Sequence, residues 1–385
     1  MAESEVEFLT FNIRVLSHLN LWPKHADEKG VWRTIKDFSL ISSVMPSYFA
    51  VLGNFDDISG LTENLCALAA IMGTWYIVSC YVSNRNDIQM LILKLKDFKI
   101  MNNNPENLFK TEKFAALFTK AFLIYGVIGI LAYCVVPPMQ IEECKIKRAQ
   151  SKYSSEIPCG LVTRCWFPAG YNVSPFIQIY FIHQVYTCLV VTSITLTITA
   201  LLCGILMHIA TQIKYLRSML KDACNDHENI LETRKKVRQC MVYHTMIIDY
   251  ATNTRNAFTT MMLMHLTLTS FVISILGFEI LSVSSISDSF RFGLHMIGWI
   301  SMLLLTCYYG QTLIDESAAI GVDAYSTSWY MCEVAVQKDI MMIVMRAQRP
   351  LTLTAISLGV ISLETFQSVM KTAYSYFTLL TNTRS

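Results

Sequence analysis

The polar side chains of the last apolar stretch, residues 351–380, have the clearest chemical pattern in the chain. They recur at steps of three or four residues, so they share one face if the segment is a helix. The stripe consists of Glu364, Ser368, Lys371, Ser375, Thr378 and Asn382. Ionisable groups are costly inside a membrane and usually face a water-filled cavity or a partner. The stripe therefore predicts either a hydrated surface or a packed face with interhelical hydrogen bonds and an ion pair between Glu364 and Lys371.

No motif in the sequence indicates an enzyme. There is no GxxxxGK phosphate-binding loop, no HExxH zinc motif, no GxSxG nucleophile elbow and no Cys/His spacing typical of a metal site. We therefore expect no cofactor and no metal. A basic cluster at residues 234–238 is typical of a solvated helix face near anionic headgroups, so the expected partner is membrane lipid and not nucleic acid.

Apolar segments must position the polar groups. The chain has 385 residues, of which 53% are hydrophobic and 16% charged, whereas soluble domains have about a quarter charged residues. A bilayer core about 30 Å thick needs about 20 mainly apolar residues per helix. Seven segments qualify: residues 37–55, 64–82, 120–139, 176–207, 256–283, 291–312 and 351–380. Since hydrocarbon cannot satisfy open backbone groups and barrel-type alternation is absent, the sequence predicts an all-α membrane protein with seven transmembrane helices in one domain, residues 1–385.

The distribution of positive charge predicts the orientation. The N-terminal segment and the alternate loops 83–119, 208–255 and 313–349 carry 22 lysines and arginines, against 6 in the other set. The positive-inside rule then places the N-terminus in the cytosol and the C-terminus outside. This is inverted relative to a G-protein-coupled receptor.

The loop at residues 140–175, expected outside, has features of an extracellular segment. It contains the sequon Asn172-Val173-Ser174, although Pro175 follows it. It also contains Cys144, Cys159 and Cys165, in the compartment where disulfides persist. Three cysteines allow at most one pair within the loop, and three free thiols are the alternative.

The segment before the last span is expected to be an amphipathic helix. In residues 329–349 the apolar Val336, Ile340, Ile343, Val344 and Ala347 recur at helical spacing. Pro350 then predicts a break or kink. The 30 residues 351–380 would form a helix of about 45 Å, longer than one bilayer core, so the helix is expected to begin in the cytosol.

The C-terminal third resembles a known family. The residues Tyr325-Ser326-x-Ser328-Trp329-Tyr330, Lys338, Arg346 to Pro350, and Phe366 followed by Lys371 to Phe377 look like the signature of insect odorant receptors. The resemblance implies a seventh helix split into a cytosolic anchor, residues 318–349, and a pore-lining part, residues 350–382. It also implies a ligand-gated cation channel in the plasma membrane of olfactory sensory neurons. Because the third inner loop is only 208–255, the resemblance favours a ligand-tuning subunit that forms a hetero-tetramer with the co-receptor.

The resemblance also assigns gate and pocket positions. Aligning the co-receptor's final motif on residues 375–378 places the apolar gate at Leu379, a second gate position at Thr383 and a pore-mouth amide at Asn382. The odorant pocket would lie in the outer halves of helices 2, 3, 4 and 6. The candidates there are Met72, Trp75, Tyr76, Gly126, Gly129, Tyr133, Tyr180, His183, Gln184, Thr187, His295, Met296 and Trp299. Aromatic and Met residues at this spacing also pack ordinary helix cores, which is the alternative for each of them.

Other membrane classes remain as alternatives. These are a gustatory receptor, a G-protein-coupled receptor and a secondary transporter. The run Ala373 to Phe377 departs from the gustatory signature. Span 3 ends in Pro137-Pro138-Met139 in place of a charged Asp-Arg-Tyr switch, and the chain has no internal repeat of the transporter type.

Overall fold

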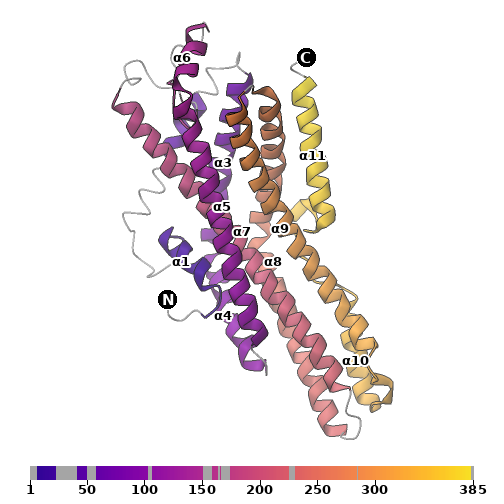
Figure 1. Cartoon of the computed structure of the whole chain (residues 1–385). Coiled ribbons are helices and arrows are strands. Elements are labelled where there is room, and N and C mark those ends of the chain that lie inside the picture. Colours follow the sequence, from indigo (N-terminus) through magenta and orange to yellow (C-terminus); the bar gives the residue numbers. More distant parts are fainter. Residues whose placement is uncertain are drawn as a thin grey trace.

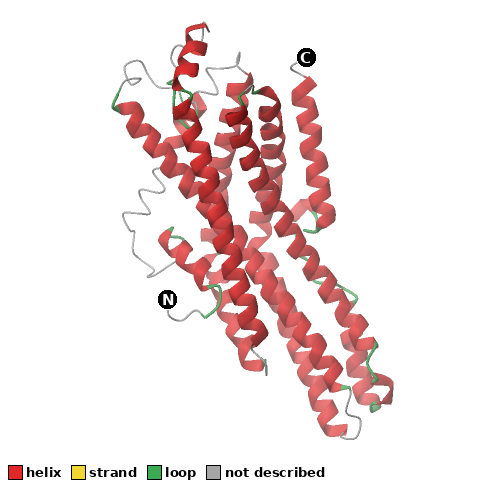
Figure 2. Cartoon of the chain, in the orientation of Figure 1, coloured by secondary structure: helices red, strands yellow, loops and turns green. Residues whose placement is uncertain are grey.

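The chain folds as a bundle of long helices (Figures 1 and 2). The computed structural model describes residues 7–22, 41–49, 58–102, 106–150, 158–163, 165, 174–224, 230–283 and 285–382. Within those residues five helices are long and apolar enough to cross a membrane. They are α3 (Ile58–Ser83), α5 (Glu106–Met139), α7 (Phe176–Ala223), α8 (Ile230–Ser282) and α9 (Ile286–Tyr325). These helices contain five of the seven predicted spans, except that α8 ends one residue before the predicted end at 283. Of the predicted span 37–55, the structure describes only residues 41–49, which are helical.

Three of these helices are much longer than a bilayer core. With 48 residues in α7 and 53 in α8, their lengths are about 72 and 80 Å at about 1.5 Å per residue. They therefore extend well beyond a hydrocarbon layer of about 30 Å. Together with α9 they form a stalk that carries α10 (Val334–Ala347) at one end of the molecule, while the C-terminus lies at the other end (Figure 1).

The shorter helices flank this frame. They are α1 (Thr10–His18), α4 (Arg85–Met101), α6 (Ile141–Gln150), the 3-10 turns η3 (Trp329–Met331) and η4 (Ile356–Leu358), and α11 (Leu363–Asn382). On α10 the predicted apolar stripe is confirmed, because Val336, Ile340, Ile343 and Ala347 are buried. The helix begins at Val334 and not at Trp329, since residues 329–331 form η3.

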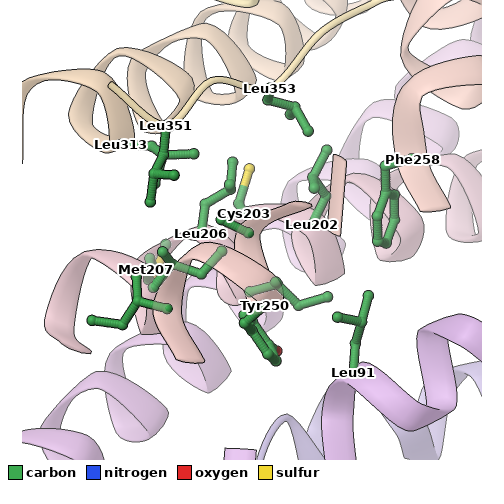
Figure 3. Close-up of a cluster of buried hydrophobic side chains, with 14 of the residues drawn as sticks. Leu91, Leu202, Cys203, Leu206, Met207, Tyr250, Phe258, Leu313, Leu351 and Leu353 are labelled. Atoms are coloured by element: carbon green, nitrogen blue, oxygen red, sulfur yellow. The ribbon is translucent and has the colours of Figure 1, made fainter. Parts of the chain in front are cut away.

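The core lies around α7, which is buried on all sides between Ile194 and Ala210. A helix that is apolar all round requires such a central position. One buried hydrophobic cluster includes Leu202, Cys203 and Leu206 of α7 together with Tyr250 and Phe258 of α8 (Figure 3). This cluster continues to α1 and α10, so one core joins the membrane part to the stalk.

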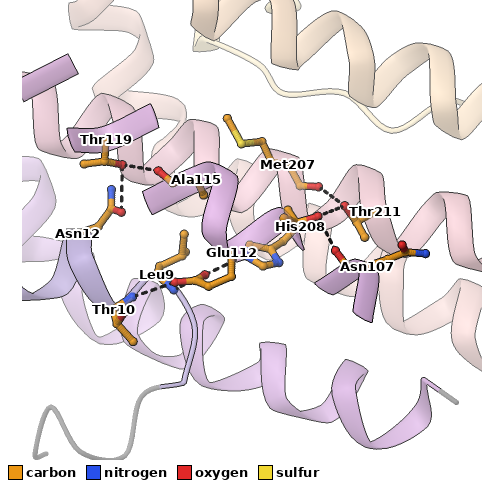
Figure 4. Close-up of polar contacts among 11 residues, drawn as sticks. Leu9, Thr10, Asn12, Asn107, Glu112, Ala115, Thr119, Met207, His208 and Thr211 are labelled. Atoms are coloured by element: carbon orange, nitrogen blue, oxygen red, sulfur yellow. Dashed lines mark hydrogen bonds and ion pairs between the residues drawn. The ribbon is translucent and has the colours of Figure 1, made fainter. Parts of the chain in front are cut away.

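The N-terminal helix is fixed by a carboxylate on α5. Glu112 accepts hydrogen bonds from the backbone N–H groups of Leu9 (2.8 Å) and Thr10 (3.4 Å), and lies 3.3 Å from Nε2 of His208 (Figure 4). The free N–H groups and the dipole at a helix N-terminus favour a negative charge there. Glu112 therefore docks α1 onto α5 and α7.

The prediction of a 30-residue last helix that begins at residue 351 is wrong. Residues 351–362 are not an α-helix, and α11 begins only at Leu363. Alternate side chains of the preceding segment, Leu351, Leu353 and Ala355, are buried, which is the pattern of an extended strand. A Cβ atom on Gly310 would lie 2.4 Å from the carbonyl oxygen of Ile361, so this glycine lets the segment pass close to α9. The 20 residues of α11 give about 30 Å, which matches one bilayer core.

The loop at residues 140–175 contains a disulfide, one of the two possibilities left open by the sequence. Cys144 pairs with Cys159, with a Cα–Cα distance of 5.9 Å. Cys165 is a buried free thiol. The sequon at Asn172 lies outside the described residues.

Candidate ligand cavity and pore helix

A cavity of about 170 Å³ lies between the helices near the disulfide-bonded end. Its walls come from α3, α5, α7 and α9, with contributions from residues 43, 47 and 163. The α3 wall is apolar and small, and consists of Cys66, Ala67, Ala70 and Ile71. Small-molecule sites typically have this character, with mostly apolar walls and few polar groups that fix orientation.

Eight of the predicted pocket residues lie at this cavity. They are Gly126, Gly129 and Tyr133 of α5; Tyr180, Gln184 and Thr187 of α7; and His295 and Trp299 of α9. The two glycines differ. A Cβ atom on Gly129 would meet nothing within 4 Å, whereas one on Gly126 would lie 2.4 Å from Cδ1 of Leu196. Gly129 thus opens into free space, and Gly126 allows α5 to pack closely on α7.

The polar groups of α7 mainly hold neighbouring segments of the chain in place. Gln184 accepts a hydrogen bond from the backbone N–H of Val162 (2.9 Å) and donates one to the carbonyl of Thr163 (3.0 Å). Thr187 and Ser43 are joined through their hydroxyl groups at 3.1 Å. These contacts hold residues 43, 162 and 163 against α7 beside the cavity.

His295 is the side chain best placed to bind a polar ligand group. The indole Nε1 of Trp299 donates to Nε2 of His295 at 3.0 Å. Because an indole N–H can only donate, Nε2 must be the acceptor, and a neutral His295 then carries its proton on Nδ1. Nδ1 is buried and has no hydrogen-bond partner among the described residues. A buried donor without a partner is costly, so a ligand oxygen would be stabilised there.

Five other candidates lie away from the cavity walls. Met72, Trp75 and Tyr76 are 41%, 51% and 41% exposed and lie on the outward face of α3. Met296 packs in the neighbouring core cluster. His183 stacks on Tyr180 with ring centroids 5.3 Å apart, and its Nε2 lies 2.9 Å from the hydroxyl of Ser42. These five residues therefore do not line this cavity.

The sequence analysis missed several wall residues. Tyr125 is one, since its hydroxyl donates to the carbonyl of Leu294 at 2.5 Å and its ring lies 3.3 Å from the Cβ position of Gly298. Others are Val191, Thr192, Thr195, Leu196 and Met302. Gly298 on α9 lies close to Tyr125, and Gly126 on α5 lies close to Leu196 and Thr192. Glycines within these helices were therefore the sequence feature that could have indicated these wall residues.

A buried ionic cluster lies behind Tyr133. The guanidinium of Arg291 lies 5.0 Å from the Tyr133 ring centroid, and its Nη2 is 3.1 Å from Oε1 of Glu63. Its Nε is 2.9 Å from Oδ1 of Asp288. The side chains of Arg291 and Glu63 are 9% and 8% exposed. The cluster thus fixes α3 and α9 beside the cavity.

Comparison with known proteins identifies the family. A family model described as 7tm Odorant receptor matches residues 57–374 of the chain. The chain belongs to the odorant receptor family. This family consists of receptors and not enzymes, in agreement with the absence of catalytic motifs from the sequence.

Curated relatives and solved structures agree with the family match. The chain is similar to odorant receptor 22c of Drosophila melanogaster, 32% identical over 149 residues, or 39% of the chain and 37% of that receptor. It is 28% identical to putative odorant receptor 92a of the same species over 158 residues, 41% of the chain and 38% of that receptor. The matched stretches thus span less than two fifths of these relatives. The insect olfactory receptor OR5 of Machilis hrabei shares the fold, with a TM-score of 0.78, 12% identity and 97% coverage of both chains.

In this odorant receptor α11 leaves its polar stripe uncovered. Glu364, Ser368, Lys371, Ser375 and Asn382 are exposed, whereas Val369 and Ala373 are buried against the bundle. The structure shows no ion pair between Glu364 and Lys371. Leu379 is 61% exposed, and Thr383 lies outside the described residues. The packed-face alternative for the stripe therefore fails within the single chain.

Proposed function

We propose that this odorant receptor is the ligand-tuning subunit of an odorant-gated, non-selective cation channel, and that it binds a small volatile organic molecule in the cavity beside Gly129. The observation that carries the proposal is the mainly apolar cavity of about 170 Å³ between four helices. An apolar cavity of about 150 Å³ in another protein binds benzene, so the volume suits a ligand of about one aromatic ring. The OR5 receptor that shares this fold was solved in complex with eugenol.

The unpartnered Nδ1 of His295 favours a ligand with an acceptor oxygen. An ester, ketone, ether or alcohol would accept this hydrogen bond while its hydrocarbon part lies against Tyr133 and Ile130. A pure hydrocarbon would leave the donor unpaired, so oxygenated volatiles should be preferred.

The channel itself requires several subunits. We propose a tetramer with the co-receptor in the plasma membrane of olfactory sensory neurons, with α10 in the cytosolic anchor and α11 along the pore. The exposed stripe from Glu364 to Asn382 supports this arrangement, because a polar face that is exposed inside a bilayer needs water or a partner.

Whole-cell recording tests the function. Cells expressing this chain with an insect co-receptor are expected to show rapid cation current when a panel of oxygenated volatiles is applied. Cells expressing either subunit alone provide the comparison for ligand dependence. A response that disappears when G-protein signalling is blocked would contradict the channel proposal and favour a G-protein-coupled mechanism.

Leu379 is expected to keep the closed pore dry. Replacing Leu379 by serine places a hydroxyl at the proposed constriction, where dewetting closes an apolar gate. We expect the basal current without ligand to rise several-fold. The same substitution at Leu363, which is 41% exposed at the other end of α11, is the control and should leave basal current unchanged. Equal basal currents in both variants would place the gate elsewhere.

A further inference from the structure

A second cavity lies at the opposite end of the membrane part and has a different chemistry. It measures about 320 Å³ and shares no residue with the ligand cavity. Its walls come from α8, the C-terminal end of α10 and the segment that leads to α11. The residues are Ala251, Thr252, Arg255, Arg346, Arg349, Pro350, Leu351 and Thr352.

Three arginines line this cavity without a carboxylate partner. None of Arg255, Arg346 and Arg349 forms an ion pair within the part of the chain that the structure describes. By contrast, Arg217 binds both Glu316 and Asp323 at 2.5 Å, and Arg291 binds Glu63 and Asp288. Three like charges around one cavity repel each other unless an anion lies between them.

Helix capping explains only part of this arrangement. Nη1 of Arg346 donates to the carbonyl of Arg349 at 2.8 Å, a contact that suits the negative end of α10. A guanidinium has five N–H donors in a planar fork, so most of its donors remain available. Arg255 comes from α8 and takes no part in the cap. The arrangement therefore has more positive charge than the helix end requires.

The backbone around the cavity is held in place. The N–H of Leu351 donates to the hydroxyl of Ser317 on α9 at 2.9 Å, and Leu351 and Leu353 are buried in the main core. The cavity is thus formed before any ligand binds, which lowers the ordering cost of binding. Thr252 and Thr352, which carry hydroxyl groups, also line the cavity.

The position of Arg255 relates the cavity to the membrane surface. The predicted span 256–283 of α8 begins at the next residue. In the orientation proposed above, this level is that of the cytosolic headgroups, where anionic lipids are concentrated. Arginine forks match phosphate oxygens in a bidentate manner.

We propose that Arg255, Arg346 and Arg349 form a binding site for a phosphate monoester group, which links α8 to the junction between α10 and α11. The phosphate belongs either to the phosphorylated headgroup of a membrane lipid or to a soluble organophosphate. Since the site lies where the stalk passes into the last helix, its ligand would stabilise one position of residues 349–352.

Binding to the purified full-length protein tests the site without any odorant response. The probes are short-chain phosphatidylinositol bisphosphate, free inositol trisphosphate and inorganic phosphate. Replacing Arg255, Arg346 or Arg349 by glutamine is expected to weaken binding of the probe at least tenfold in each case. Arg238→Gln removes the same charge from an exposed position on α8 and is the matched control. An Arg349→Lys variant keeps the charge but loses the fork, and should bind more weakly than the unmodified protein.

The outcomes separate the possible sources and the competing explanation. Binding of the lipid probe alone would identify a lipid site, and equal binding of inositol trisphosphate would identify a soluble organophosphate site. Equal loss in the Arg238 control would show general charge attraction and overturn the proposal. Loss of the oligomer on size-exclusion chromatography, without any phosphate binding by the unmodified protein, would also overturn it and assign the arginines to a carboxylate of a neighbouring subunit.

Discussion

Replacing Gly129 by leucine is expected to raise the odorant concentration for half-maximal current about 100-fold or to abolish the response, while the amount of receptor at the cell surface stays unchanged. The leucine side chain would extend into the cavity, because a Cβ atom at this position meets nothing within 4 Å. A factor of 100 corresponds to about 2.7 kcal/mol of binding free energy. Leucine is also one of the better helix formers, whereas glycine costs about 0.8–1 kcal/mol relative to alanine, so α5 itself should not be weakened.

Gly126 supplies the matched control for this prediction. It lies on the same helix, one turn away, but its Cβ position is 2.4 Å from Leu196 and 3.1 Å from Thr192. Gly126→Ala should therefore overpack the contact between α5 and α7, at a cost of about 1–3 kcal/mol. We expect less receptor at the surface, with a much smaller change in half-maximal concentration than for Gly129→Leu in the protein that remains, because the added methyl group points at Leu196 and Thr192. Concentration–response curves with surface labelling separate the two effects, and an unaltered curve for Gly129→Leu would show that the ligand binds elsewhere.

The transmembrane helices could be predicted from the sequence because their signal is local. Twenty consecutive apolar residues are sufficient evidence for a span, and α5, α7 and α9 all contain the predicted segments. The rotation of an individual helix could not be predicted in the same way. In α3 apolar residues lie on every face, so the pattern does not show that Cys66 and Ala70 face the cavity while Trp75 faces outward.

The start of the last helix depended on distant residues. Pro350 indicated a break, but it gave no reason for helix formation to be delayed to Leu363. The intervening segment is extended because Leu353, Ala355 and Ile361 pack into the core, and because Gly310 on α9 leaves room for the backbone. Such contacts, between residues far apart in the chain, override local helix propensity.

The ionic cluster behind Tyr133 was also beyond local prediction. Glu63 and Arg291 each lie at the end of an apolar span, where a charge usually faces water. Only the packing of α3 against α8 and α9 removes both from solvent and brings them together. Their pairing is a property of the fold.

Removal of one charge from this cluster is expected to have a large effect on folding. Arg291→Gln removes the positive charge that pairs with Glu63 and Asp288 in a largely buried site. Loss of one partner of a buried pair costs about 3–5 kcal/mol, a large part of the roughly 5–15 kcal/mol that stabilises a typical protein. We expect surface expression to fall at least tenfold, measured by labelling of intact cells. Asp288→Asn, at the more exposed side of the cluster, should have a smaller effect.

A double variant distinguishes pairing from simple loss of polarity. In Glu63→Gln combined with Arg291→Gln both buried charges are absent, so neither is left without its partner, and two amides of similar size remain. If the two residues act as a pair, the double variant should recover much of the surface expression lost by Arg291→Gln alone, since contacting residues give non-additive effects. Losses that simply add would mean that each side chain stabilises the fold through other contacts. The recovered receptor would also show whether Arg291 positions Tyr133, because its half-maximal odorant concentration should then be raised even though the protein is folded.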